Sequence, residues 1–222
     1  MDYKDLREEV ATTARRMISS GLVKGTSGNV SARTPENTVL VTPSGLDYAE
    51  LGPDDVVLVD LNGEFLDGPW KPSTETPMHT GIYRARPEVG GIVHTHSRYA
   101  TTLACLAWEI PPIHYMLTVL SDDGRVSIAP YTLYGTDELA RLAAEALGER
   151  HTACLLQNHG TITVGEGPEE AFSRTEILEE MAELYYRARI AGEPVLLNTE
   201  EVREVAEKIS GYGKAKSAGS DE

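Results

Sequence analysis

The dipeptide Asn62-Gly63 constrains the fold most, because it stands between two short apolar runs. Residues 56–61 and 64–66 read as strands, and Asn-Gly favours the tight turn of an antiparallel hairpin. Elsewhere along the chain, short apolar runs alternate with helical patterns, which is typical of α/β proteins. We therefore predict an α/β fold with three layers (α/β/α), in which a mixed, mainly antiparallel sheet is flanked by helices.

Helical periodicity and capping residues predict six helices. They are expected over residues 4–20, 76–86, 97–108, 136–147, 168–191 and 199–209, with Thr199 as the N-cap of the last one. Residues 110–116 are rich in proline and read as a loop or a short strand. Since nothing in the pattern resembles a linker, we expect one domain over residues 1–213 and a flexible polar tail over residues 214–222.

The net charge of −15 argues against nucleic acid or an anionic membrane as the partner. The first residues are charged and do not resemble a secretory signal, and no apolar run is long enough to span a bilayer. We therefore expect a cytoplasmic protein. A small anionic substrate remains compatible with this charge, because backbone N–H groups can bind phosphate locally.

Three histidines and one glutamate have the spacing of a metal site. His94 and His96 are separated by one residue on an apolar run, so on a strand their side chains leave the same face. His159 follows a second apolar run and precedes Gly160, and Glu75 stands just before an expected helix. Three imidazoles with a displaceable carboxylate suit a catalytic Zn²⁺. The alternatives are a hydrogen-bonded histidine pair and a carboxylate favoured by the helix dipole.

Such a metal would draw electrons from the carbonyl of a hydroxyketone, so that an enediolate becomes accessible. Glu75 is then the candidate for proton transfer at carbon. The turns at 25–29, 42–45 and 73–74 supply N–H and hydroxyl donors and together suggest a phosphate site. Breaking a carbon–carbon bond needs a second proton carrier, for which Tyr115, Tyr134 and Tyr212 are candidates.

Six motifs in one order give the chain a specific resemblance. They are Gly-Thr-Ser-Gly-Asn-Val-Ser at 25–31, Thr-Pro-Ser-Gly at 42–45, Pro-Ser-Thr-Glu at 72–75, His-Thr-His at 94–96, Ile-His-Tyr-Met at 113–116 and Gln-Asn-His-Gly at 157–160. In this order they resemble the class II aldolase/adducin family, and the resemblance extends to about residue 213.

The resemblance implies a zinc-dependent aldolase that cleaves a ketose 1-phosphate, such as L-fuculose 1-phosphate, into dihydroxyacetone phosphate and an aldehyde such as L-lactaldehyde. It implies that His94, His96 and His159 bind one Zn²⁺, and that Glu75 binds it at rest and then acts as acid and base. Tyr115 would reach the site from a neighbouring subunit of a homotetramer, and Tyr212 would close over the substrate. The implied phosphate ligands are Gly28, Asn29, Ser44, Gly45, Ser73 and Thr74.

The sequence also departs from the pattern. Tyr134 stands near the part of the site that is expected to hold the aldehyde portion of the substrate, where fuculose-phosphate enzymes of the family carry phenylalanine. At Ser44 and Thr74, serine and threonine are exchanged relative to the family pattern, so a hydroxyl is kept. Residues 117–125 also differ from the pattern. Three alternatives stay open within the family: an L-ribulose-5-phosphate 4-epimerase, a methylthioribulose-1-phosphate dehydratase and a non-catalytic, adducin-like interaction module.

Overall fold

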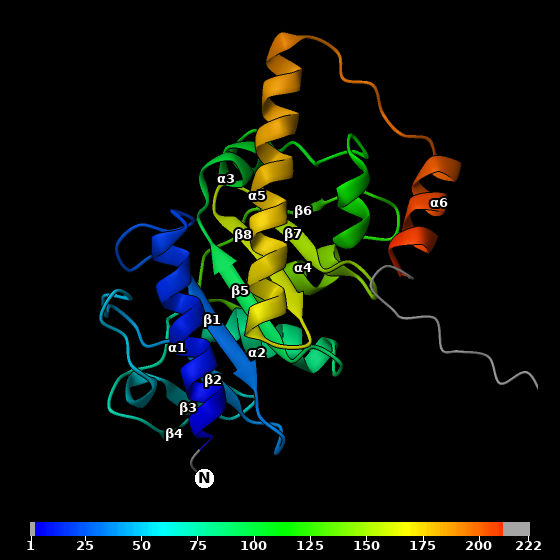
Figure 1. Ribbon diagram of the computed structural model, residues 1–222. Coiled ribbons are helices and arrows are strands. Elements are labelled where there is room, and N and C mark those ends of the chain that lie inside the picture. Colours follow the sequence, from blue (N-terminus) through cyan, green and yellow to red (C-terminus); the bar gives the residue numbers. More distant parts are fainter. Residues whose placement is uncertain (1–2, 211–222) are drawn as a thin grey trace, which may run out of the picture.

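One mixed sheet runs through the computed structural model, which describes residues 3–210 (Figure 1). Within these residues the sheet has eight strands in the order β4-β3-β2-β1-β5-β8-β7-β6. Only β6 and β7 are parallel, and every other neighbouring pair is antiparallel. The predicted sheet is therefore confirmed. The strands are β1 (Asn29–Arg33), β2 (Val39–Val41), β3 (Val57–Val59), β4 (Phe65–Asp67), β5 (Gly91–Thr95), β6 (Ser127–Ala129), β7 (Ala153–Leu156) and β8 (Gly160–Gly165).

The described helices follow the predicted ones closely. They are α1 (Lys4–Ser19), α2 (Thr76–Ala85), α3 (Arg98–Cys105), α4 (Asp137–Leu147), α5 (Pro168–Ala191) and α6 (Thr199–Ser210), with 3₁₀ turns η1 (Pro53–Asp55) and η2 (Tyr115–Val119). The helix α3 ends before the predicted residue 108, because Ala107 takes a positive φ of 52° and turns the chain. Asn198 rather than Thr199 caps α6, since its Oδ1 accepts hydrogen bonds from the N–H groups of Glu200 and Glu201.

Alternating side chains on β2 explain the three layers. Val39 and Val41 are fully buried in the cluster formed with α2 and α4. Leu40, between them, is buried on the other face in the cluster that contains α1 and Phe172 of α5. Both faces of the sheet are therefore covered by helices, with α1 and α5 together in front of it (Figure 1).

The register of the central strands brings the candidate metal ligands together. On β5, His94 pairs with Ile162 of β8, and Thr95 pairs with Thr161. The turn between β7 and β8 therefore lies beside the end of β5, and this turn carries His159. Two segments that are about 65 residues apart in the sequence thus meet at the same end of the central strands.

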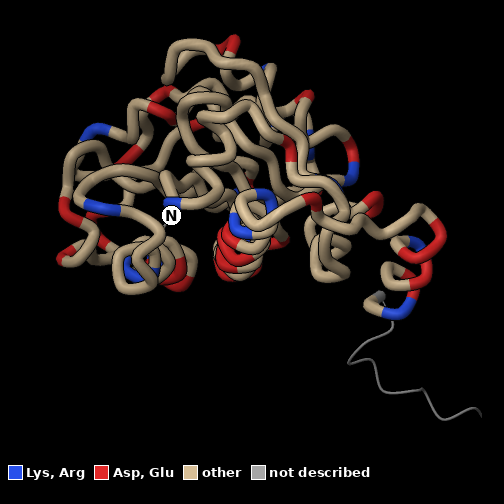
Figure 2. Tube along the Cα trace, turned by 90° about the horizontal axis from the view of Figure 1, so that it is seen from above, with Lys and Arg blue, Asp and Glu red and all other residues tan. Residues whose placement is uncertain are grey.

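Acidic residues are distributed around the outside of the described chain, with lysines and arginines between them (Figure 2). None of the described helices combines the length and the apolar character that crossing a membrane requires. The cytoplasmic location stays a prediction. The domain boundary at residue 213 and the flexible tail also stay predictions, because residues 211–222 lie outside the described part of the chain.

Candidate active site

Three imidazoles and one carboxylate meet at the end of β5. Ligand atoms of Glu75, His94, His96 and His159 all lie within 4.8 Å of one another. The Nε2 atoms of His94 and His96 are 3.0 Å apart. Glu75 Oε2 is 3.1 Å from His94 Nε2, and Glu75 Oε1 is 3.0 Å from His159 Nε2. All four side chains can therefore contact one ion.

The surroundings of these atoms fit a divalent metal. His94 Nδ1 lies 2.8 Å from the backbone carbonyl of Thr161, which can only accept, so Nδ1 carries the proton and the Nε2 lone pair faces the cluster. Partial burial, together with His94 and His159, lowers the pKa of His96 to about 4 and keeps it neutral. Glu75 Oε1 is buried and, apart from the 3.0 Å contact with His159 Nε2, has no polar partner among the described residues. A cation between these atoms would satisfy that oxygen.

Close packing at Gly160 allows the histidines to converge. A Cβ atom at this position would lie 2.4 Å from the carbonyl oxygen of Thr95 and 2.8 Å from the ring of His96. It would also lie 3.1 Å from the ring of His94. The glycine is thus required by the approach of the turn to β5, rather than by its backbone conformation.

Glu75 directly precedes α2 and is held from two sides. Its backbone N–H donates to Ser73 Oγ at 3.2 Å, and its Oε2 accepts from Asn29 Nδ2 at 2.9 Å. Burial raises the pKa of Glu75, but attraction to His94 and the contact with His159 outweigh it, so the pKa lies well below its usual range. The side chain is therefore a carboxylate anion, as a metal ligand must be.

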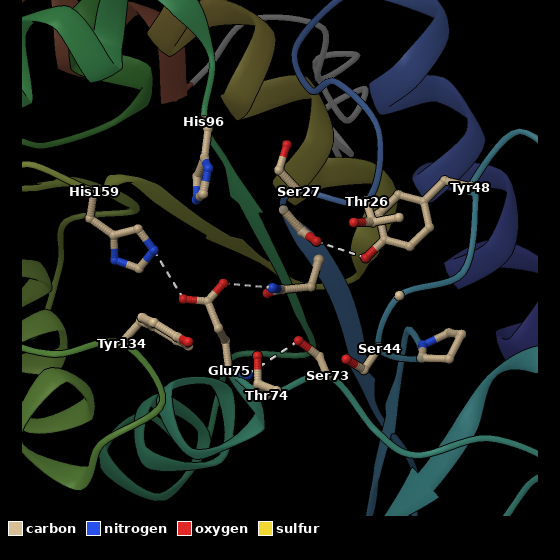
Figure 3. Close-up of a pocket in the computed structure, with 14 residues that line it drawn as sticks. Thr26, Ser27, Ser44, Tyr48, Ser73, Thr74, Glu75, His96, Tyr134 and His159 are labelled. Carbon is tan, nitrogen blue, oxygen red and sulfur yellow. Dashed lines mark hydrogen bonds and ion pairs between the residues drawn. The ribbon is translucent and has the colours of Figure 1, made fainter.

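A pocket of about 390 Å³ opens beside this cluster. Figure 3 shows hydroxyl side chains along one wall and Glu75, His96 and His159 along the other. No lysine or arginine lines it among the described residues, so an anion in it must be bound by hydroxyl and N–H donors. All seven residues predicted to bind substrate or phosphate line this pocket, namely Gly28, Asn29, Ser44, Gly45, Ser73, Thr74 and Tyr134.

Two of these residues are glycines for different reasons. Gly28 has a φ of 79°, and a Cβ there would lie 2.7 Å from the carbonyl oxygen of His94, so the turn at residues 25–29 packs directly against β5. Gly45 has a φ of 75° with open space around its Cα. A side chain at Gly45 would therefore strain the backbone without a steric clash.

Tyr134 lies at the rim of the pocket and is 60% exposed. Its loop is fixed by Gly135, where a Cβ would lie 2.8 Å from the carbonyl oxygen of Thr74. The turn at residues 73–74 and the loop that carries Tyr134 are thus packed together, and Figure 3 shows the Tyr134 side chain beside Glu75 and His159.

Two of the predicted catalytic residues are not brought to this pocket within the described chain. Tyr115 is 50% exposed on η2 and lines a separate groove with Met116, Val119 and residues of α6. Tyr212 lies outside the described residues. Their catalytic roles stay predictions.

Sequence analysis did not assign roles to two buried side chains near the site. Tyr48 donates its O–H to the carbonyl oxygen of Gly28 at 2.7 Å and so supports the turn at residues 25–29. Burial raises the pKa of Tyr48 to about 12, so it stays protonated. His79 contacts Asn29, and the spacing of four residues from Glu75 on a predicted helix is a signal that could have identified it.

Comparison with known proteins gives consistent matches over most of the chain. The model of the family described as "Class II Aldolase and Adducin N-terminal domain" matches residues 8–186. A 5-deoxy-D-ribulose 1-phosphate aldolase from Bacillus thuringiensis serovar kurstaki is 43% identical, over 94% of this chain and 97% of its own length. An L-fuculose phosphate aldolase from Escherichia coli K12 is 36% identical, over 96% and 98%. A solved structure titled L-fuculose 1-phosphate aldolase superposes with a TM-score of 0.88 at 39% identity, covering 93% of this chain and 96% of the other.

Proposed function

Because the chain belongs to the class II aldolase and adducin family and is a class II, metal-dependent aldehyde-lyase, we propose that it cleaves a ketose 1-phosphate into dihydroxyacetone phosphate and an aldehyde. The observation that carries this proposal is the cluster of Glu75, His94, His96 and His159 at the end of a pocket lined by hydroxyl and N–H donors. Such a pocket can hold the phosphate while the carbonyl faces the cluster.

We propose Zn²⁺ as the metal, held by the three imidazoles and, at rest, by Glu75. Three histidines with a carboxylate are typical of catalytic zinc sites. When bound, the ion would supply a Lewis acid for the ketose carbonyl.

The substrate class follows from what the relatives act on. 5-Deoxy-D-ribulose 1-phosphate and L-fuculose 1-phosphate both carry phosphate on carbon 1, and both end in a methyl group at the other end of the chain. Phosphate would contact Gly28, Asn29, Ser44, Gly45, Ser73 and Thr74. The methyl end would lie near Tyr134, whose exposed ring offers an apolar surface at the rim. We therefore propose a terminally deoxygenated ketose 1-phosphate as substrate.

The proton at the donor carbon is assigned to Glu75. Its depressed pKa keeps it charged while it faces the imidazoles. A carboxylate that leaves this environment regains a higher pKa and can then take a proton from carbon or return one to it. In the cleavage direction, the substrate hydroxyl loses its proton, the carbon–carbon bond breaks, and Glu75 returns a proton to the donor carbon.

The hydroxyl proton is assigned to Tyr115 of a neighbouring subunit in a homotetramer, with Tyr212 as the group that closes over the substrate. The position of Tyr115 supports this assignment, since it is half-exposed on η2, away from the pocket of its own chain. A residue placed in this way would need a neighbouring subunit's pocket to take part in the reaction.

The experiment is a product assay with four substrates: 5-deoxy-D-ribulose 1-phosphate, L-fuculose 1-phosphate, methylthioribulose 1-phosphate and L-ribulose 5-phosphate. The proposal predicts release of dihydroxyacetone phosphate, with the terminally deoxygenated ketose 1-phosphates preferred. Interconversion of pentulose 5-phosphates without fragments would instead identify an epimerase. Loss of water from methylthioribulose 1-phosphate would identify a dehydratase, and inactivity of zinc-loaded protein toward all four would support an interaction module.

A further inference from the structure

A buried chain of hydrogen bonds leads from the interior of the protein to Glu75. Tyr83 Oη is 2.9 Å from Ser31 Oγ, which is 2.6 Å from His79 Nδ1. His79 Nε2 is 2.5 Å from Asn29 Oδ1, and Asn29 Nδ2 is 2.9 Å from Glu75 Oε2. These side chains lie on β1 and α2, and the first four residues of this chain are at most 2% exposed.

The chemistry of the donors and acceptors gives this chain one direction. His79 is fully buried, and its two ring nitrogens contact the uncharged groups Asn29 Oδ1 and Ser31 Oγ, so burial keeps the ring neutral with one proton. Asn29 Oδ1 can only accept, which places that proton on Nε2. Nδ1 is then the acceptor for the O–H of Ser31, and Ser31 Oγ accepts from Tyr83. Each of these hydrogen bonds thereby fixes the orientation of the next one.

The orientation of the Asn29 amide is the link that matters for Glu75. If the amide were reversed, its oxygen would face the carboxylate and its NH₂ group would face an N–H of His79. Both contacts would then be repulsive, in a place where water cannot relieve them. The Glu75 carboxylate can only accept and so requires the NH₂ group of Asn29, while a proton on His79 Nε2 satisfies the amide oxygen; both contacts therefore support the observed orientation.

We propose that His79 is a positioning residue, which acts through Asn29 to hold the Glu75 carboxylate toward the three imidazoles. The inference rests on the metal-binding and proton-carrying roles proposed for Glu75. Asn29 holds Oε2, whereas Oε1 contacts only the candidate metal ligand His159 among the described residues. Glu75 can therefore turn about a fixed oxygen when the other one leaves a bound ion.

The first experiment observes the His79 ring in the unsubstituted protein, and His79→Gln serves only to assign its signal. Nitrogen-15 spectra of the histidine rings in metal-free protein report which nitrogen of each ring carries the proton. We expect one ring with a proton on Nε2 and none on Nδ1, protected from solvent and absent from the spectrum of His79→Gln. A ring protonated on Nδ1, or one that exchanges between the two forms, would overturn the proposal.

The second experiment measures zinc affinity by competition with a chelator, without substrate. His79→Leu removes the donor to Asn29, whereas the amide of His79→Gln can replace it. Loss of such a supporting contact typically weakens metal binding about 10- to 100-fold, so we expect that loss in His79→Leu and less than about threefold in His79→Gln. Equal effects of the two substitutions, or no effect of either, would refute the proposal.

A control separates positioning from loss of stability. Thr175→Val removes a buried hydroxyl that bonds Thr163 Oγ1 at 2.6 Å, on the opposite face of the sheet from α2. We expect it to lower the melting temperature and to leave zinc affinity unchanged. Equal weakening of zinc binding in Thr175→Val and His79→Leu would show that stability alone is responsible.

These readouts are independent of the reaction. If the product assay fails while the tautomer and the affinity difference are as expected, the proposed substrate is wrong and the positioning role stands. If zinc binds equally to the wild type and to both His79 variants, the positioning role fails even when the protein is an active aldolase.

Discussion

The buried His79 ring makes the stability of the metal-free protein sensitive to acid. Its pKa is lowered to about 3 by burial, against a reference value of 6.5 for an exposed histidine. The unfolded chain therefore binds a proton at this residue between these two values, and the folded protein does not. Stability is retained above pH 6.5 and is lost as the pH falls toward 3. From pH 7 to pH 5 this single residue should cost about 2 kcal/mol of unfolding free energy.

His79→Gln tests this figure, because glutamine does not titrate and keeps a donor for Asn29. Urea unfolding of metal-free wild type and variant should be compared at both pH values and at one protein concentration. We expect the wild type to lose about 2 kcal/mol more than the variant on acidification, and the two to change in parallel between pH 7 and pH 8. Equal acid sensitivity would show that the ring is solvated or charged in the folded protein, which would refute the reasoning.

Three further predictions concern the site. Glu75→Gln should keep the fold but abolish exchange of the donor-carbon proton of dihydroxyacetone phosphate with deuterated water; normal exchange would remove Glu75 from this role. Tyr115→Phe should spare that exchange and depress cleavage. If Tyr115 acts on a neighbouring subunit, tetramers assembled at random from equal amounts of the Tyr115→Phe and Glu75→Gln chains should have about a quarter of their sites intact, because such a site takes Glu75 from one kind of chain and Tyr115 from the other. A mixture as inactive as its parents would contradict that assignment. Gly160→Ala should weaken zinc binding about 10-fold or more, because its Cβ would lie 2.4 Å from Thr95 O and 2.8 Å from the His96 ring. Zinc affinity is measured by competition with a chelator. Unchanged affinity would show that the turn can move at no cost.

Local sequence patterns predicted the elements of this fold better than their arrangement. The hairpin at Asn62-Gly63 is present, with Gly63 at a φ of 84° and β3 paired antiparallel with β4. The helices were predictable because their periodicity and caps are local signals. The order of the strands was not, because the pairing of β1 with β5 and of β5 with β8 depends on contacts between distant segments. The one parallel pair, β6 with β7, was likewise not readable from either strand alone.

The candidate ligands of the cluster carried local signals, although their convergence depends on the pairing of β5 with β8. His94 and His96 are related by strand periodicity, and His159 is marked by the glycine after it. The family assignment from six ordered motifs was confirmed. Tyr48 and His79 carried weaker signals, because their importance comes from contacts with Gly28 and Asn29 that only the folded chain creates.

The charge of the protein bears on how this site can bind a phosphate. The chain carries a net charge of −15, and the pocket has no lysine or arginine among its described lining residues. Long-range attraction therefore cannot collect an anionic substrate. The N-terminus of α2, which follows Ser73, Thr74 and Glu75, supplies only about half a positive charge. A divalent ion beside Glu75 would reverse the local field, so phosphate binding and metal binding should be coupled. Metal-free protein should therefore bind dihydroxyacetone phosphate weakly, even though the turns proposed to bind phosphate already line the pocket.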